Sequence, residues 1–568
     1  MGRAERPVLH RIGDAVAEAQ DLINRIASLN REIQLSKRSG ADSTGAENAQ
    51  SAMIDQLSAL MDVRATAQSE GGVHVRTSGG ALLVGVEPAR LSYTPSSAPF
   101  ATHGTIRVNE DLGTQSNLEP FLLGGELKGL LQVRDQDLPG LADALGGFAA
   151  SLADALNQAH NENASSPAVG ELIGRQTGLL ATDAHGFTGS AIIAVVDATG
   201  ALRERISIDF DARTVSTEAP AASFSFLGGE IGDLTSALNA ALAAATPAGS
   251  VNFSGGVLSL NVGAGGGLVI QQDPADPSAR AGRGFSHFFG LNDIVSRPSP
   301  LFFENGVQGA DLHGFAAGGE ISYQVRDATG RFIADRTISI SAGLTGPVSD
   351  WNELLTELNA TGTGLGEFGA FALNASTGRL SFTANPAFQV SLVSDSTKRG
   401  ATGVSLSALH GLNGAATAGR ALETNVSASV AADATRLAVG KPDLTLALGQ
   451  RVIEAGDNSG AAALLHARDA VRLFSSAGVL SAQSTTLGVY AARLGGEAGR
   501  LSADAQRGAD GAQAVANAAG DRRAEVEGVS LDDELLKMTT FQNAYAAAAR
   551  VIQAATEMLD VLMALGRR

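Results

Sequence analysis

The sequence predicts a multidomain α+β protein in which helical regions at both chain ends enclose two tandem, duplicated β-rich modules. Three observations support this fold class. Apolar residues recur at helical spacing near both termini. One long β-rich pattern occurs twice in the middle of the chain. The chain has 568 residues, and the usual domain length then predicts about three to five domains. We expect the terminal helical regions to pack as coiled coils.

The first part of the chain reads as helical. Apolar residues at helical spacing predict a helix over residues 14–36 and a second helix over residues 52–63. The polar segment 39–51 between them favours a loop, so we predict an antiparallel helical hairpin. Short strands with Gly-Gly turns follow in residues 71–86. A pair of helices interrupted by Pro139 comes next.

The middle of the chain contains an internal repeat. A His-Gly-Phe sequence begins at His185 and again at His313, an offset of 128 residues. Each copy continues with a strand, an Asp-Ala-Thr-Gly turn, a second strand, a short helix and a hairpin, and closes with Gly-Leu-Asn. That closing sequence begins at Gly290 and Gly411, an offset of 121 residues. We therefore predict two diverged copies of one β-rich module.

These patterns divide the chain into seven predicted regions. They are a helical hairpin at 1–66, a small β region at 67–125, a helix pair at 126–165, module copy 1 at 166–300, module copy 2 at 301–420, a long helical region at 421–527, and a terminal amphipathic assembly helix at 528–568.

Composition excludes several classes of function. The net charge is −18, and no Lys/Arg cluster is present, which argues against nucleic acid or an anionic membrane as a partner. The chain has no cysteine, which excludes disulfides, thiolate metal sites and cysteine nucleophiles. The first 20 residues lack the apolar segment of a secretory signal peptide. No stretch approaches the roughly 18 apolar residues of a membrane span.

Candidate catalytic and ligand motifs are weak. Gly364, Gly366 and Gly369 spell G-x-G-x-x-G, but a polar loop precedes them and a predicted strand follows, which is the wrong context for a dinucleotide site. His185 and His313 have no further His, Asp or Glu at metal-ligand spacing, so we interpret them as structural residues of the repeat. The sequence thus predicts neither an enzyme nor a metal or cofactor site.

The last helix carries the strongest signal. Apolar residues follow one another at spacings of three or four along residues 535–562, which predicts one apolar stripe. Ser530 is the predicted N-cap, with Asp533 at the capping-box position. The stripe either packs on its own domain or forms a coiled coil with other molecules. The predicted assembly residues are Leu535, Met538, Phe541, Tyr545, Ile552, Leu559 and Leu562.

This terminal stretch resembles the C-terminal signature of flagellar axial proteins. The resemblance rests on Gly-Val-Ser-Leu-Asp-Asp-Glu at 528–534, on Phe-Gln-Asn-Ala-Tyr to Val-Ile at 541–552, and on Glu-Met-Leu-Asp-Val-Leu at 557–562. Residues 10–165 and 420–565 more broadly resemble the hook-associated proteins that join hook to filament. No match to that family is apparent in the duplicated middle.

The resemblance implies a structural, non-enzymatic subunit of the bacterial flagellum. Its partners would be copies of itself and neighbouring axial proteins, namely the hook protein and the second junction protein, with an export chaperone. It would leave the cell by the flagellar type III pathway without a cleaved signal peptide. Family members begin with a further helix that pairs with the last one. This chain begins inside a later helical region, so we expect its last helix to be mostly disordered before assembly.

Two alternatives remain open at the level of sequence. The chain could be another axial protein of the hook type. The tandem modules at 166–420 could instead be a glycan-binding or hydrolytic unit carried on an axial scaffold.

Overall fold

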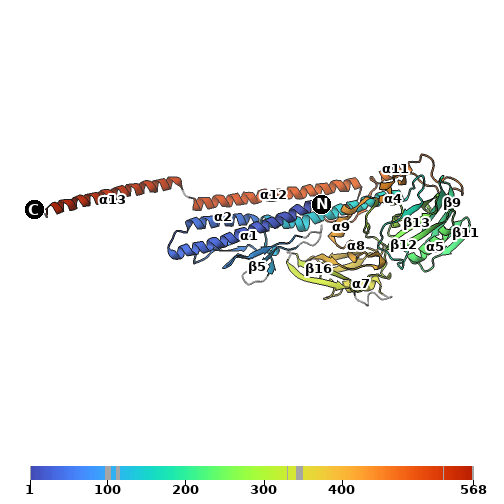
Figure 1. The fold of residues 1–568 in the computed structure, drawn as a ribbon, viewed down its shortest axis with the longest axis horizontal. Coiled ribbons are helices and arrows are strands. Elements are labelled where there is room, and N and C mark those ends of the chain that lie inside the picture. The colour runs from blue at the N-terminus through green and yellow to red at the C-terminus, as the bar shows by residue number, and fades with distance from the viewer. Residues whose placement is uncertain are drawn as a thin grey trace. The chain divides into compact units, whose positions relative to one another are not determined.

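The computed structural model of the chain contains both helices and strands, in agreement with the α+β prediction (Figure 1). The chain divides into two compact units, Met1–Gly495 and Gly496–Arg568. The structure describes residues 2–95, 104–109, 115–328, 331–340, 349–528 and 530–565.

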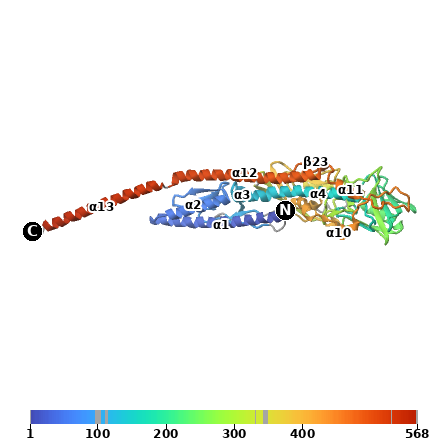
Figure 2. The ribbon, with the colours of Figure 1, turned by 90° about the horizontal axis from the view of Figure 1, so that it is seen from above.

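The helical hairpin is present and longer than predicted. Helix α1 spans Gly2–Ser39 and packs side by side with α2, Thr44–Leu60 (Figures 1 and 2). The predicted loop 39–51 is wrong, because only residues 40–43 separate the two helices. The carboxylate of Asp42 accepts the Thr44 N–H at 3.0 Å and so starts α2 early. A polar stretch can continue a helix where only one face is buried.

Two small sheets pack against this hairpin. Their buried side chains, such as Val75, Leu83 and Val108, belong to one hydrophobic cluster with Ile12 and Leu57 of the helices. The first sheet has the order β1-β2-β3 and the second has the order β4-β5-β6. The strands are β1 (Val63–Ala67), β2 (Val73–Thr77), β3 (Leu82–Val84), β4 (Arg90–Ser92), β5 (Arg107–Asn109) and β6 (Gln115–Asn117).

The predicted break at Pro139 is absent. Helix α3 (Gly125–Gln132) continues through a π-helical turn, Val133–Asp137, into α4 (Leu138–Asn161). Pro139 lies in the first turn of α4, the part of a helix that tolerates proline best. The predicted helix pair is therefore one continuous helical run, and α3 and α4 lie end to end in Figure 2.

The first β-rich module is built on a five-stranded antiparallel sheet of order β11-β10-β9-β8-β14. A second sheet has the order β12-β13-β7, and α5 packs against β12. The elements are β7 (Glu171–Ile173), β8 (Ser190–Asp197), β9 (Leu202–Asp209), β10 (Thr214–Glu218), β11 (Ala221–Ser225), α5 (Ile231–Ala244), β12 (Gly249–Ser254), β13 (Val257–Val262), β14 (Gly266–Gln272) and α6 (Phe285–Phe289).

The second module has a three-stranded sheet of order β17-β16-β20 and a β18-β19 hairpin. Thr329 and Gly330 of its Asp-Ala-Thr-Gly sequence lie outside the described residues. Both α6 and α8 end on a left-handed glycine, Gly290 with φ 69° and Gly411 with φ 68°. The elements are β16 (Glu320–Asp327), β17 (Phe332–Ser339), α7 (Trp351–Leu358), β18 (Gly369–Leu373), β19 (Leu380–Ala384), β20 (Phe388–Asp395) and α8 (Leu406–His410).

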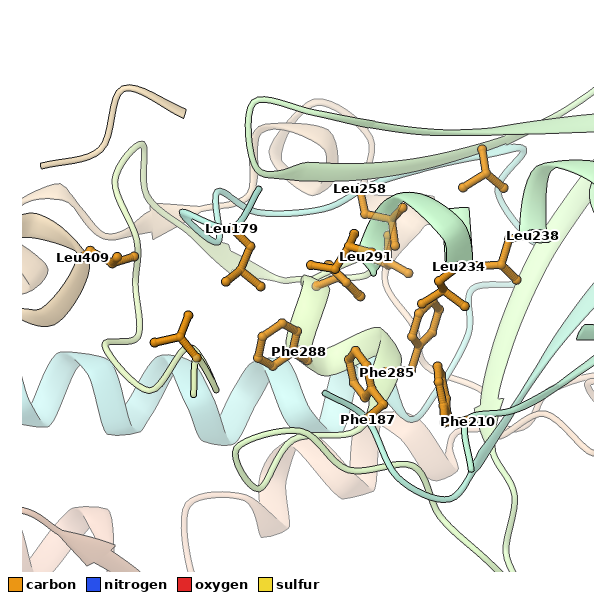
Figure 3. Packing of buried hydrophobic residues seen from close by; sticks show 14 of the residues in the cluster. Leu179, Phe187, Phe210, Leu234, Leu238, Leu258, Phe285, Phe288, Leu291 and Leu409 are labelled. Carbon is orange, nitrogen blue, oxygen red and sulfur yellow. The ribbon is translucent and has the colours of Figure 1, made fainter. Parts of the chain in front are cut away.

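One hydrophobic cluster extends through both modules (Figure 3). In the first module the Phe187 ring lies 4.9 Å from the Phe210 ring and 5.7 Å from the Phe285 ring, centroid to centroid. Leu409 and Trp351 of the second module belong to the same cluster. The two modules therefore pack against each other through one common apolar cluster.

The prediction of a long helical region over 421–527 is wrong for residues 425–486. This part is mostly irregular chain, because Gly, Pro and Asp-x-Thr sequences such as Asp443-Leu-Thr445 form local turns. Helix α9 (Gly414–Glu423) precedes it. Its short elements are β21 (Asn425–Val426), α10 (Ala428–Ala432), α11 (Ser459–His466), and β22 paired with β23 (Arg472–Phe474 and Gln483–Thr485). Strand β21 pairs with β15 (Val295–Ser296), which lies earlier in the chain. Two long helices then follow, α12 (Leu487–Glu527) and α13 (Leu531–Leu565).

Candidate assembly surface

Helix α13 begins at a well-formed cap. The Oγ atom of Ser530 accepts the Asp533 N–H at 3.3 Å, and the Ser530 carbonyl accepts the Glu534 N–H at 3.0 Å. Three acidic residues occupy the first turn, where they complement the partial positive charge of the helix N-terminus. The predicted N-cap is thus confirmed, and the chain has a definite start signal for this helix.

The predicted assembly residues are all exposed on α13. Exposure ranges from 51% for Met538 to 80% for Tyr545, and no described residue of the helix is buried. An exposed apolar row of this length is unusual for a soluble surface and is typical of interaction sites. The exposed fractions of the other five are Leu535 54%, Phe541 74%, Ile552 67%, Leu559 63% and Leu562 70%.

The spacing of these residues suits coiled-coil packing. From Met538 to Leu562 the stripe alternates steps of three and four once Ala548 and Ala555 are included, which is the heptad repeat of a left-handed coiled coil. Thr539, Thr540 and Thr556 turn their hydroxyls back to carbonyls four residues earlier, each at 2.8 Å. Their polar groups are therefore satisfied inside the helix.

Sequence reasoning missed a second exposed apolar row on the same helix. Val551, Met558 and Leu565 follow at intervals of seven residues and are 67–70% exposed. Leu536 and Val561 are exposed as well. The seven-residue interval was a usable signal, so the apolar surface of the C-terminal half of α13 is wider than one stripe.

The polar residues of the neighbouring helix α12 form local ion pairs. Arg500 bonds Glu497 and Asp504 on the same helix, and Arg507 bonds Asp504. Pairs of this kind between exposed groups contribute little to stability individually. Their spacing of three or four residues is the one that slightly favours the helical conformation.

His185 and His313 have structural surroundings, as their interpretation as repeat residues expects. The Nδ1 atom of His185 accepts the Phe187 N–H at 3.2 Å, and the Nδ1 atom of His313 accepts the Phe315 N–H at 3.0 Å. Burial lowers the pKa of each histidine to about 4, so both rings are neutral and able to accept. Among the described residues, no group of three or more His, Asp or Glu is placed to hold a metal ion.

Gly364 and Gly366 lie in the turn after α7, and Gly369 begins strand β18. A dinucleotide-binding sequence would open a helix at this point.

Within the described ranges, no helix has the length and apolarity to cross a membrane.

Comparisons with known proteins match both ends of the chain. Residues 3–171 match the family described as the flagellar hook-associated protein FlgK helical domain. Residues 523–565 match the family described as the flagellar basal body rod FlgEFG protein C-terminal. The second match includes α13 and all seven predicted assembly residues. Both are flagellar structural families rather than enzyme families.

Two curated relatives are flagellar hook-associated protein 1 of Salmonella typhimurium and of Salmonella typhi. Each is 31% identical to this chain over 154 residues, which covers 27% of this chain and 28% of the relative. The chain thus spans little more than a quarter of the curated relatives it matches. One solved structure that matches is the flagellar hook junction protein FlgK from Burkholderia pseudomallei. The match covers 93% of this chain and 86% of that chain, with 17% identity and a TM-score of 0.34.

The family matches agree with the residue pattern of the terminal helix. The helical segment of the chain is thus similar to flagellar hook-associated proteins, and its C-terminal segment is similar to flagellar basal body rod proteins.

Proposed function

We propose that this chain is a structural, non-enzymatic subunit of the junction between flagellar hook and filament. The observation that supports this most strongly is the capped, exposed apolar helix α13, inside the segment that matches an axial-protein family. In this proposal α13 forms a coiled coil with helices of neighbouring subunits. Subunits then repeat head to tail, the geometry that builds helical tubes.

The proposed partners follow from the same surface. They are copies of this chain and neighbouring axial proteins, namely the hook protein and the second junction protein. A surface as apolar as α13 would favour aggregation inside the cell, which supports an export chaperone that covers it. The proposal also includes export by the flagellar type III pathway and an extracellular location.

The match at residues 3–171 distinguishes this proposal from a hook-type axial protein. A C-terminal axial segment alone is compatible with rod and hook proteins, whereas the helical domain matches a hook-associated protein.

We also propose that the two β-rich modules arose by duplication and are the variable part of the subunit. Their hairpins β8–β9 and β16–β17 share one register at an offset of 130 residues. Ser190 pairs with Asp209, as Glu320 pairs with Ser339. Each hairpin also has an irregularity in the register just before its Asp-Ala-Thr-Gly sequence, at Val195/Val196 and at Val325/Arg326. Shared detail of this kind supports duplication over chance similarity.

The test substitutes one residue of the apolar face. Ile552→Asp places a charge in the predicted coiled-coil seam and should abolish incorporation into flagella. Gln553→Asp introduces the same charge one position along, off the apolar stripe, and should incorporate normally. Purified proteins should show the same circular dichroism for the β-modules in both variants. Normal incorporation of the Ile552→Asp subunit would refute the proposed interface.

A further inference from the structure

Two buried arginines occupy equivalent positions at the ends of the two modules. Arg280 follows β14 and is 2% exposed, and Arg399 follows β20 and is fully buried. Each binds the carbonyls of the His-Gly-Phe segment of its own module. Arg280 Nη1 donates to His185 O at 2.5 Å, and Arg399 Nε donates to His313 O at 2.9 Å.

Each arginine also reaches the opening segment of the other module. Arg399 of the second module donates from Nη1 to Gly178 O at 2.8 Å. Arg280 of the first module donates from Nε to Asn305 O at 3.1 Å. Gly178 and Asn305 lie within one residue of equivalent positions at the 128-residue offset. These reciprocal contacts have the form of a two-fold interface, in which each module donates the same kind of hydrogen bond to the other.

The carboxylates of this interface are not equivalent. Asp183 forms a two-pronged ion pair with Arg399, with Nη1–Oδ2 at 2.7 Å and Nη2–Oδ1 at 2.9 Å, and both side chains are fully buried. Its counterpart Asp311 has no ion pair with Arg280 among the described residues. Nη2 of Arg280 is buried without a hydrogen-bond partner in the same part of the chain.

The two aspartates otherwise act alike. Asp183 Oδ2 accepts the Leu180 N–H at 2.7 Å, and Asp311 Oδ2 accepts the Gln308 N–H at 2.7 Å. The local turn is thus the same in both modules, and only the contact across the interface differs.

We propose that the Arg399–Asp183 pair is a one-sided lock that fixes the orientation of the two modules, and that Arg280 and Asp311 form its open, non-bonded half. The guanidinium fork has a planar geometry that matches a carboxylate, so the closed half fixes direction as well as distance. The shared apolar cluster holds the modules together without that directionality. The lock therefore makes the tandem modules one rigid body.

The experiment measures the distance between the modules in the full chain. Since the chain has no cysteine, spin labels can be attached only to the introduced exposed pair Ser216→Cys and Ser381→Cys. Pulsed electron resonance should give one narrow distance distribution in this background. Asp183→Asn should widen that distribution at least twofold. Asp311→Asn, which makes the same change in the equivalent turn but breaks no ion pair, should leave it unchanged. Equal widths for the two variants would overturn the proposal.

Hydrogen exchange on the unsubstituted chain provides a second measurement should Asp183→Asn not fold. If the lock couples the modules, the amides of residues 178–187 and 306–315 exchange in a single cooperative opening. Opening of one segment while the other stays protected would refute the lock. Arg399→Lys retains the charge but not the fork, and it should widen the distance distribution less than Asp183→Asn does.

Discussion

The side-chain amide of Asn157 on α4 and the backbone of Val295 in the first module form two reciprocal hydrogen bonds. Asn157 Nδ2 donates to Val295 O at 2.8 Å, and its Oδ1 accepts the Val295 N–H at 2.8 Å. One turn further along, His160 Nδ1 contacts Asn292 O at 2.6 Å, and its Nε2 accepts the Ala438 N–H at 2.9 Å. This row of polar side chains joins the helical region to the β-rich part through backbone groups.

The joint should weaken when its central amide is removed. Asn157→Ala leaves the N–H and C=O of the half-buried Val295 without this partner, and an unsatisfied group costs at most about 1–3 kcal/mol when it is fully buried. We expect a lower urea midpoint and faster hydrogen exchange at residues 292–296. Glu162→Ala, at an exposed position on the α4 C-cap, should change neither quantity. Unchanged exchange in Asn157→Ala would mean that this joint contributes no stability.

Acid should destabilise the modules through their buried histidines. Burial lowers the pKa of His185 and of His313 to about 4, whereas an unfolded histidine titrates near 6.5. Between these values the unfolded state binds more protons. The free energy of unfolding therefore does not depend on these histidines above about pH 6.5. It falls as the pH drops from 6.5 toward 4, by about 1.4 kcal/mol per pH unit for each histidine.

The matched variant isolates this contribution from that of the carboxylates. In His313→Gln, the loss of unfolding free energy between pH 7 and 4.5 should be smaller than in the unsubstituted chain. The exposed His466 supplies the control, and His466→Gln should leave the pH profile as it is. An identical pH profile in His313→Gln would contradict a neutral, accepting His313.

The single tryptophan offers a test of the shared core. Trp351 is fully buried in the second module, and its ring lies 5.8 Å from Phe315, so its emission reports on that module. Phe210→Ala in the first module removes a side chain from the same cluster and should cost about 3–5 kcal/mol. We expect the Trp351 unfolding transition to shift to lower urea.

A matched core substitution outside that cluster provides the control. Val108→Ala truncates a buried residue of the separate helical-domain cluster and should leave the Trp351 transition in place. If Phe210→Ala leaves the urea midpoint of the Trp351 transition unchanged, the modules unfold independently.

Helix α13 should gain protection only on assembly. In the isolated subunit, the amides of residues 531–565 should exchange rapidly, because an isolated helix is marginal without a partner for its apolar face. In sheared flagella the same amides should be protected. Strong protection in the isolated, monomeric subunit would contradict an intermolecular partner for this face.

The sequence was sufficient for features that repeat at short intervals. The α13 stripe, its Ser530 cap and the strand pairs on either side of the Asp-Ala-Thr-Gly sequences could be predicted, because residues three, four or two positions apart determine them. The irregular chain at 425–486 was predicted to be helical because its Ala- and Leu-containing stretches have helical composition. The turn residues between those stretches prevent long helices from forming. The helix break predicted at Pro139 is wrong because a π-helical turn precedes this proline, and the helix continues through that turn.

Long-range contacts were beyond the reach of the sequence. The partners of Asn157 lie 138 residues away, and Arg399 pairs with a residue 216 positions earlier. No local spacing encodes such pairs. The repeated His-Gly-Phe sequence nevertheless directed attention to His185 and His313, the residues whose carbonyls the buried arginines bind.

The position of this chain in the intact flagellum tests the central claim most directly. Gold-labelled antibody against residues 166–420 should mark isolated flagella at one place, the boundary between hook and filament. Label along the whole filament, on the hook alone, or on no part of the flagellum would contradict a junction subunit.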